Sequence, residues 1–361
     1  MSQACAQCIG RAWLLGRVGG HLDAVRSRVG DLLCLEAAEL VAAVGGRRRA
    51  ELLRELEALD ADRYRRRASD TGLELMCCCA ERYPPALLML RNPPAVLHVA
   101  GGLERFLALS DGDPVALVGA RRGSEYGRGV AESLGRSLAA AGITVVSGMA
   151  LGTDSAAHRG ALAAGGATVA VLPCGADRAY PASARALRER IVGTGAAVSE
   201  LPPGSAARRW AFPARNRIIA GLAAMTVVVE AGSRSGAMVT ARVATELGRV
   251  VGAVPGRVTS PHAAGPHELL SRGATLVRSG QDVLDALFGA GVRRAGDGGE
   301  RAELAPELQV LLAAIGDGHD TAQALTRAGL EPGAGLAALA ALELAGYVRR
   351  EPGGRYSVVL A

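Results

Sequence analysis

Hydrophobic residues recur at two different spacings along this chain. In its first part they return every three or four positions, as in residues 32–44 and 51–59, which predicts helices with one apolar face. We therefore expect a small all-α domain over residues 1–75.

The spacing changes after residue 114. From there to residue 287, short valine-rich runs alternate with helical segments, and glycines mark the junctions. The runs are 115–118, 144–147, 168–172, 197–199, 226–230, 250–254 and 275–277. Strands that are apolar throughout are buried on both faces, so the pattern predicts a Rossmann-like α/β domain, a mainly parallel sheet with helices on both faces. We place it at residues 76–288, with its core at 114–287 and a proline-rich connector at 83–94.

The remainder of the chain has a different composition. Residues 289–303 are rich in Gly, Arg and acidic side chains and poor in apolar ones, as a linker would be. The last domain covers residues 304–361, and its expected helices and strands are 306–315, 321–327, 335–345, 347–350 and 355–359. Three helices followed by a hairpin predict a winged helix-turn-helix.

Charge and aromatic content add an expectation about the partner. Lys and Arg exceed Asp and Glu, 41 to 35, and the pI is near 9.2, which favours an acidic partner such as nucleic acid or phosphate. Aromatic residues make up only 3% of the chain, so an aromatic side chain in a polar loop is a candidate for function.

No segment is expected to enter a membrane. No run approaches the roughly 18 uninterrupted apolar residues of a span. Arg11 and Arg17 interrupt the apolar N-terminal part, which argues against a secretion signal. We expect a cytoplasmic protein.

The seven cysteines fit a reducing compartment better than a disulfide framework, since 77–79 are contiguous. Cys5 and Cys8 have the spacing of half a zinc site, but no second pair with matching spacing follows. The favoured interpretation is structural or incidental thiols, with no metal and no cofactor.

Two glycine-rich strand exits are candidate anion sites, because small residues let backbone N–H groups approach a ligand at a helix N-terminus. The first, at 118–127, could be an ordinary tight turn, but Arg121 and Arg122 favour phosphate. The second begins at Ser147 and holds Asp154 and His158 four residues apart. That pair could bind metal or act as acid and base, but we favour a structural role, with Asp154 capping its helix.

The segment 208–217 has the densest functional signal, with four arginines and two of the five Trp and Phe residues of the chain. Guanidinium groups bind phosphates, and aromatic faces stack unpaired bases, which favours single strands over duplex. The alternative is that the rings anchor the loop on the sheet. For Trp210 this structural role is favoured, and for Phe212 the binding role. A third small and polar loop, at 231–240, is expected at the same edge of the sheet.

With these motifs in view, the sequence resembles the bacterial DNA-processing protein A (DprA/Smf) family. The motifs that carry the resemblance are VGAR at 118–121, the loop at 147–158, FPARNR at 212–217, the loop at 230–241 and PG at 255–256. The resemblance covers 114–287, and the flanking domains resemble sterile-alpha-motif-like and winged-helix modules. It implies a homodimer that binds and protects single-stranded DNA and helps to load the RecA recombinase in natural transformation or recombination.

The motif positions and the loops together give the candidate DNA- and phosphate-binding residues. They are Gly119, Arg121, Arg122, Ser124, Tyr126, Gly127, Ser147, Gly148, Gly152, Arg209, Phe212, Arg215, Asn216, Arg217, Ser235, Gly236 and Thr240. Two positions depart from the family pattern, Ala120 where Ser is usual and Thr153 where Ile or Val is usual; the first removes a hydroxyl that could meet a phosphate.

Two other functions can be weighed. A related fold occurs in phosphoribohydrolases that process nucleotides, but the chain lacks their Pro-Gly-Gly-x-Gly-Thr loop, so no catalysis is expected. Sequence-specific duplex binding is also disfavoured, because the would-be recognition helix at 332–345 holds no Arg, Lys, Asn or Gln to contact base edges.

Overall fold

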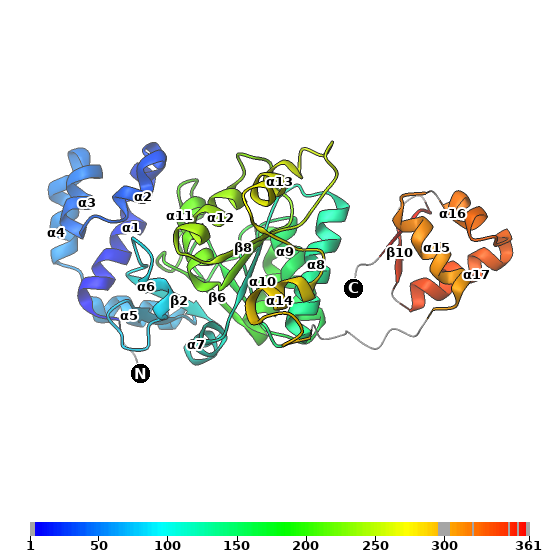
Figure 1. Cartoon of the computed structure of the whole chain (residues 1–361). Coiled ribbons are helices and arrows are strands. Elements are labelled where there is room, and N and C mark those ends of the chain that lie inside the picture. The colour runs from blue at the N-terminus through cyan, green and yellow to red at the C-terminus, as the bar shows by residue number, and fades with distance from the viewer. Residues whose placement is uncertain (1–3, 295–303, 320, 346, 352–353, 359–361) are drawn as a thin grey trace. The chain divides into compact units, whose positions relative to one another are not determined.

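The computed structural model describes residues 4–294, 304–319, 321–345, 347–351 and 354–358 (Figure 1). The chain forms two compact units, Met1–Ala295 and Gly296–Ala361, and each is described by itself.

A nine-stranded sheet organises the first unit. Its strands are β1 (Glu74–Cys77), β2 (Val96–Ala100), β3 (Val115–Val118), β4 (Val145–Ser147), β5 (Thr168–Val171), β6 (Ala196–Ser199), β7 (Met225–Val228), β8 (Val250–Ala253) and β9 (Thr275–Leu276). They lie in the order β1-β2-β6-β5-β4-β3-β7-β8-β9. Every neighbouring pair from β6 to β9 in this order is parallel, whereas β1–β2 and β2–β6 are antiparallel. The predicted Rossmann-like, mainly parallel sheet is confirmed.

The seven valine-rich runs all became strands, but two further strands were not predicted. Glu74–Cys77 and Val96–Ala100 form an antiparallel hairpin on the edge next to β6, with the proline-rich connector between them. The run at 96–100 is fully buried, as its apolar residues would indicate. Its one polar residue, His98, interrupts the apolar pattern by which the strand could have been predicted.

Helices cover both faces of the sheet, as expected. In β3, Val115 and Leu117 face a core shared with α8 (Glu125–Ala140), α9 (Thr153–Ala163) and α14 (Gly280–Phe288), because alternate residues of a strand point to opposite faces. On the other face, the core includes α7 (Leu103–Asp111), α11 (Ala211–Leu222) and α12 (Gly236–Glu246). This part of the chain also contains α6 (Pro85–Leu88), α10 (Arg185–Thr194) and α13 (Ala264–Ser271). Among the described helices, none is both long enough and apolar enough to cross a membrane.

The N-terminal residues form the predicted helical region. Its α-helices are α1 (Ala6–Ala24), α2 (Val29–Leu32), α3 (Ala37–Val44), α4 (Arg49–Glu57) and α5 (Ala61–Asp70). The expected helix at 32–44 is divided, because Glu36 and Glu39 form a capping box that starts α3.

The helical region packs against the segment that leads into α11. Gly16 and Gly19 of α1 lie against Pro202 and Arg208, at distances that leave little room for a side chain. The indole of Trp210 is 1% exposed and belongs to the apolar cluster of these helices. The structural role favoured for Trp210 fits this placement.

The second unit has the predicted winged-helix elements. They are α15 (Pro306–Gly316), α16 (Thr321–Arg327), α17 (Pro332–Leu344), β10 (Val348–Arg350) and β11 (Tyr356–Val358). Leu339 and Leu342 of α17 are buried in its core, whereas Leu336 and Leu344 are exposed.

The buried imidazole of His98 in β2 ties the helical region to the sheet. Its Nδ1 lies 3.2 Å from the Ser199 carbonyl oxygen, which can only accept, so Nδ1 carries the proton and Nε2 accepts from the Tyr64 hydroxyl at 2.7 Å. Burial lowers the pKa of His98 from 6.5 to about 4.

We predict acid destabilisation with a window set by this histidine. The unfolded chain binds a proton near pH 6.5 and the folded chain only near pH 4, so this contribution is complete above pH 6.5 and is lost as the pH falls to about 4. The loss is roughly 3 kcal/mol in the free energy of unfolding. Urea unfolding at several pH values would measure it. His98→Gln should flatten the decline, whereas His21→Gln, on an exposed residue, should not; equal slopes for both variants would contradict the assignment.

Candidate functional site

A pocket of about 290 Å³ lies at the carboxyl ends of β3, β4 and β7. Residues from the loops after these strands and from α11 line it: Val118, Gly119, Arg121, Ala150, Asp154, Phe212, Pro213, Arg215, Asn216, Ile219, Ser235, Gly236, Ala237 and Thr240. Eight of the candidate residues named from the sequence are therefore brought together: Gly119, Arg121, Phe212, Arg215, Asn216, Ser235, Gly236 and Thr240.

The topology explains this convergence. From β3 the chain adds β4, β5 and β6 on one side and later β7, β8 and β9 on the other. The loops after β3 and β7 therefore leave in opposite directions and open a crevice between them, which is where ligands bind in open α/β sheets.

Arg215 is the buried cation of this pocket. Its side chain is 5% exposed, and its Nη1 donates to the Val171 carbonyl oxygen at 3.0 Å. In the described part of the chain, its Nε has no hydrogen-bond partner and no carboxylate lies within 4.0 Å of the guanidinium. Burial lowers the pKa of Arg215, and the nearby Asp154 acts against that shift. A buried guanidinium with so few partners favours an anionic ligand.

Gly148 makes room for this side chain. A Cβ at residue 148 would lie 1.3 Å from Nη1 of Arg215, so the guanidinium rests directly on the backbone of the β4 loop. Gly148 was a candidate for close approach to a ligand, and the structure gives it a different task, which is to admit Arg215.

Asp154 stabilises the same loop through a hydrogen bond to its backbone. Its Oδ2 accepts from the Ala150 backbone N–H at 3.3 Å, and burial raises its pKa while Arg215 opposes the shift. His158 is also buried, and its Nδ1 lies 2.8 Å from the Thr168 hydroxyl. Each side chain therefore has a partner within the protein, which fits a structural role for both. The predicted cap is wrong, however, because Gly152 is the N-cap residue of α9 and no side chain caps this helix, whereas Asp154 accepts from the loop before it.

Phe212 and Arg121 form the exposed rim of the pocket. The Arg121 Cζ lies 4.4 Å from the centroid of the Phe212 ring. Tyr180 meets the same ring edge-on, with centroids 5.2 Å apart. Phe212 is half-buried and Tyr180 is 36% exposed. Tyr180 was missed, although a tyrosine among the polar residues that follow β5 was a usable signal.

The α12 side of the pocket is built from small polar residues. The Ser235 hydroxyl caps α12 by accepting from the Ala237 N–H at 3.2 Å. The Asn216 Nδ2 donates to the Gly236 carbonyl oxygen at 3.1 Å, which links α11 to the start of α12. This N-terminal end of a helix adds partial positive charge to the pocket.

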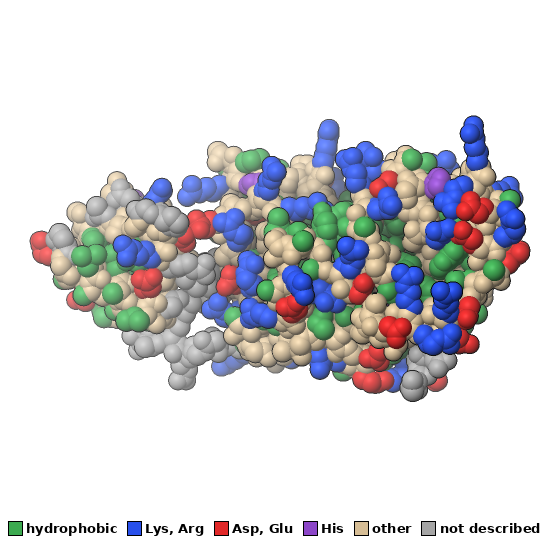
Figure 2. All heavy atoms as spheres, turned by 180° about the vertical axis from the view of Figure 1, so that it is seen from behind, with side chains coloured by type: hydrophobic (Ala, Val, Ile, Leu, Met, Phe, Trp, Pro, Cys, Tyr) green, Lys and Arg blue, Asp and Glu red, His purple; other side chains and the backbone are tan. Residues whose placement is uncertain are grey.

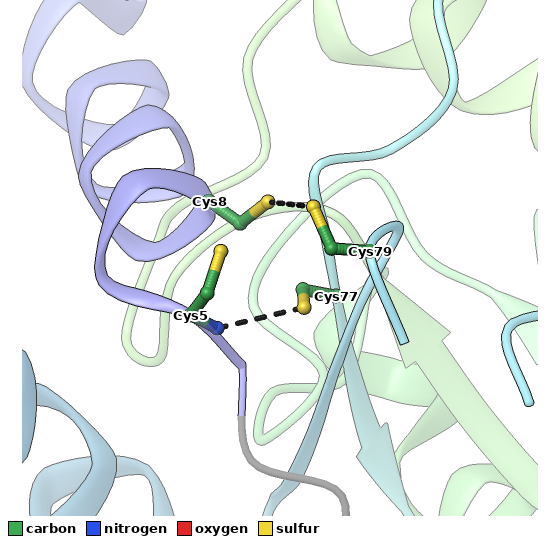
Figure 3. Close-up of side chains that lie close together, drawn as sticks. All are labelled: Cys5, Cys8, Cys77 and Cys79. Carbon is green, nitrogen blue, oxygen red and sulfur yellow. Dashed lines mark hydrogen bonds between the residues drawn. The ribbon is translucent and has the colours of Figure 1, made fainter. Parts of the chain in front are cut away.

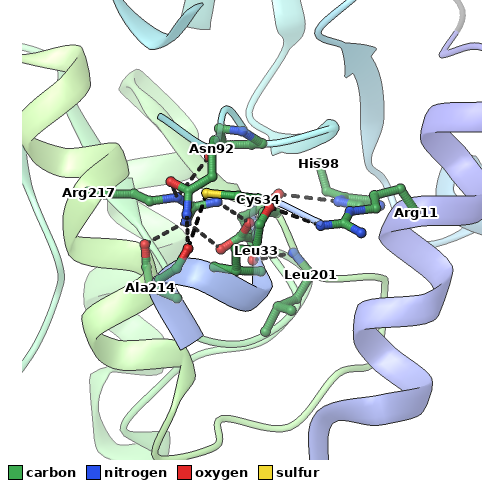
Figure 4. Close-up of polar contacts among 12 residues, drawn as sticks. Arg11, Leu33, Cys34, Asn92, His98, Leu201, Ala214 and Arg217 are labelled. Carbon is green, nitrogen blue, oxygen red and sulfur yellow. Dashed lines mark hydrogen bonds and ion pairs between the residues drawn. The ribbon is translucent and has the colours of Figure 1, made fainter. Parts of the chain in front are cut away.

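Arg217 corrects the sequence-based expectation, since it does not line the pocket. Its guanidinium is buried and forms two hydrogen bonds to the Glu200 carboxylate, at 2.8 and 2.7 Å. Its Nε also donates to Asn92 (Figure 4). Arg217 follows Arg215 by two residues on a helix, so the two side chains point in different directions. The sequence motif gives no indication of this pairing, because Glu200 lies 17 residues before Arg217.

Three further candidates, in the loop after β3, make contacts within the protein that stabilise this loop. The Ser124 N–H and hydroxyl both donate to the Glu230 carboxylate, at 2.8 and 2.5 Å. Gly127 is small for the same reason, because a Cβ there would lie 2.2 Å from Glu230 Oε2. The Tyr126 hydroxyl donates to the Pro255 carbonyl oxygen at 3.0 Å. The predicted phosphate contact of Ser124 and Gly127 does not fit this arrangement.

The remaining candidates also lie outside the pocket lining. The buried Ser147 hydroxyl donates to the Leu117 carbonyl oxygen at 2.6 Å. Gly152 has a φ of +83° and lies against the backbone of Ala120. Arg122 and Arg209 are exposed and stand free to meet solvent or a ligand that extends beyond the pocket.

Positive charge extends over the surface as well. The chain contains no lysine, so every blue side chain in Figure 2 is an arginine, and many lie on the face of the first unit that it shows. Planar guanidinium groups favour paired contacts to phosphate oxygens.

The structure brings together cysteines that the sequence pattern did not pair. The second pair absent from the sequence pattern exists in space, because Cys77 and Cys79 lie beside Cys5 and Cys8 (Figure 3). The expectation of incidental thiols depended on that missing pair.

Comparison with known proteins gives consistent matches. The family model of DNA recombination-mediator protein A matches residues 74–288, and that of the DprA winged helix domain matches residues 299–354. The chain is 37% identical to Protein Smf of Escherichia coli K12 over 284 residues, which are 76% of this chain and 75% of that protein. It is 44% identical to the putative DNA processing protein DprA of Mycobacterium tuberculosis H37Rv over 251 residues, 68% of this chain and 64% of that protein.

Two solved structures resemble the fold. The X-ray structure of DNA processing protein A from Streptococcus pneumoniae aligns with a TM-score of 0.62 and 32% identity, over 79% of this chain and 94% of that one. A structure that describes the single-stranded DNA binding mode of DNA processing protein A from Helicobacter pylori aligns with a TM-score of 0.53 and 29% identity, over 60% and 97%.

The different surroundings of two arginines predict different effects on stability. Arg217→Ala should lower the free energy of unfolding by about 3–5 kcal/mol, because it leaves the buried Glu200 carboxylate without its partner. Arg121→Ala removes an exposed side chain and should change it by about 0.5 kcal/mol or less. Chemical unfolding of both variants would check this. An Arg217→Ala protein as stable as the parent would show that the Glu200 pair is not the structural contact described above.

Proposed function

The chain belongs to the DNA recombination-mediator protein A (DprA) family, and from that premise we propose that it binds single-stranded DNA in the pocket at the carboxyl ends of β3, β4 and β7. The observation that carries the proposal is Arg215, a buried guanidinium that lines the pocket without a carboxylate within salt-bridge distance in the described residues. A backbone phosphate supplies the missing negative charge.

The rim favours unpaired bases. The Phe212 ring, the Arg121 guanidinium plane and Tyr180 lie together at the pocket mouth, and such planar groups stack on bases that are not held in a duplex. Arg122 and Arg209 are exposed and can contact the strand as it leaves the pocket. The Helicobacter pylori relative is described as binding single-stranded DNA, which supports the same function here.

The proposal extends to the cellular role implied by the family. We propose a homodimer that protects single-stranded DNA and helps to load the RecA recombinase during transformation or recombination, in the cytoplasm where that DNA lies. Light scattering should then give about twice the 36.8 kDa chain mass. Nuclease protection of a bound oligonucleotide and RecA filament formation on it would test the other two roles.

We also propose that the pocket binds without catalysis. Asp154, which lines the pocket, and His158 are the pair considered as acid and base, and each is engaged within the protein, at Ala150 and Thr168. The alternative is a nucleotide-processing phosphoribohydrolase. Release of free base from nucleoside monophosphates, at a rate proportional to protein concentration, would establish the alternative.

The strand preference can be predicted. An oligo-dT of about 30 nucleotides should bind much more tightly than the matching duplex, with log K falling by about 0.7 per log unit of salt for each phosphate contact. Arg121→Ala should weaken binding and reduce this slope by about 0.7, whereas Phe212→Ala should weaken it by about 1–3 kcal/mol with the slope unchanged. Fluorescence anisotropy at several salt concentrations measures both. Arg190→Ala, on the exposed surface of α10, is the matched control. Equal affinity for single strand and duplex would refute the proposal.

A glycine variant separates position from charge. Gly148→Ala places a methyl group on the Arg215 guanidinium and should displace it, so affinity should fall at least about tenfold although no charge is lost. Gly129→Ala is the control, because a Cβ at residue 129 meets nothing within 4 Å. If Gly148→Ala binds as tightly as the Gly129→Ala control, Arg215 is not the anchor of the site.

A further inference from the structure

Four cysteines from two distant parts of the sequence meet beside the sheet. The Sγ atoms of Cys5, Cys8, Cys77 and Cys79 all lie within 4.8 Å of one another (Figure 3). All four are free thiols in the structure. The proposed DNA pocket involves none of them, so their grouping requires a separate account.

The local structure of each pair presents its sulfurs to the same point. Cys5 is the N-cap residue of α1 and Cys8 lies in the first turn of that helix. Cys77 is the last residue of β1, and Cys79 is in the turn that follows it.

The spacing of the sulfurs fits a tetrahedral ion. With zinc–sulfur bonds of about 2.3 Å, the edges of a tetrahedron of four sulfurs are about 3.8 Å long. Cys8 Sγ and Cys79 Sγ are 3.6 Å apart, well beyond a disulfide bond. A four-iron cluster binds each cysteine to a different iron, which holds the sulfurs further apart than this group does.

Backbone contacts around the group are those of a supported metal site. The Cys5 N–H donates to Cys77 Sγ at 3.5 Å, the kind of hydrogen bond that orients a coordinated thiolate. Arg65 donates through Nε and Nη2 to the Ala4 carbonyl oxygen, at 3.1 and 2.7 Å, and so fixes the chain immediately before Cys5. Cys5 and Cys79 reach toward the surface, which leaves a path of entry for an ion.

We propose that Cys5, Cys8, Cys77 and Cys79 bind one zinc ion, forming a closed structural site that joins α1 to β1. On binding, each thiol releases its proton to solvent and forms one zinc–sulfur bond, so four protons leave per ion and no electrons are transferred. The ion closes a loop of chain between residues 8 and 77, which includes α1 after its first turn and all of α2 to α5. Its task is to fix the helical region on the sheet.

Cys78 provides a sharp internal control. Its Sγ lies 3.7 Å from Cys8 Sγ, yet it is not one of the four mutually close sulfurs. Cys34 is exposed and is also outside the group. Cys78→Ser and Cys34→Ser should therefore keep the metal that Cys8→Ser and Cys79→Ser lose.

Metal content of the full chain tests the proposal. Protein purified without chelators or a metal-binding tag should contain about one zinc per chain by mass spectrometry of the elements. Cobalt bound in place of zinc should show the intense visible absorption of tetrahedral thiolate coordination. A zinc content equal in the Cys8→Ser variant and the parent would overturn the site, as would iron in place of zinc or a mass loss that indicates disulfides.

Zinc titration of the parent protein tests the proposal without cysteine variants, which could fail to fold. Reduced, metal-free protein should take up one equivalent of zinc in competition with a colorimetric indicator, and its thermal midpoint should rise by at least about 5 °C. Magnesium should not replace zinc, because it prefers oxygen ligands. Failure to take up zinc would refute the proposal and leave the predicted DNA binding unaffected.

Discussion

The structure of the site depends on one buried guanidinium held at the switch point of the sheet. Arg215 reaches from α11 across the end of β4, rests on Gly148 and donates to Val171 at the end of β5. A charge so placed is costly to bury unless its remaining donors are satisfied. The strands, the glycine and the crossing helix must all be in place to hold it. The pocket is therefore a consequence of the topology rather than of any single loop.

The two arginines of α11 have different roles. Arg215 lines a cavity, whereas Arg217 is neutralised by Glu200 and helps to fix α11 to the body of the unit. Just before the helix, Trp210 is buried among the N-terminal helices, and its backbone N–H donates to Asp23. Segment 208–217 thus packs against the N-terminal helices through Trp210 and also supplies Arg215, the buried cation of the pocket. This packing keeps the Arg215 guanidinium in a defined position.

Sequence reasoning succeeded where the signal was local. Apolar runs predicted the seven parallel strands, and glycine with arginine at the strand exits indicated the edge at which Arg121 lies. It failed where the partner is distant in the sequence. Tertiary packing decides whether Arg217 faces solvent or pairs with Glu200. It also decides that the Glu230 carboxylate accepts from Ser124. The spacing of Cys77 and Cys79 differs from that of Cys5 and Cys8, so only the fold could show that they meet.

Helix α1 connects these observations. At about 1.5 Å per residue its 19 residues extend over roughly 28 Å. Its N-terminal end, with Cys5 as the N-cap and Cys8 in the first turn, lies beside the edge strand β1. Its later turns bring Gly16 and Gly19 against the segment that precedes α11. An ion that fixes the first turn restricts the whole helix, because a helix moves as a rod. The proposed zinc site and the buried Trp210 are then two fixed points of one element, and that element supports the helix from which Arg215 enters the pocket.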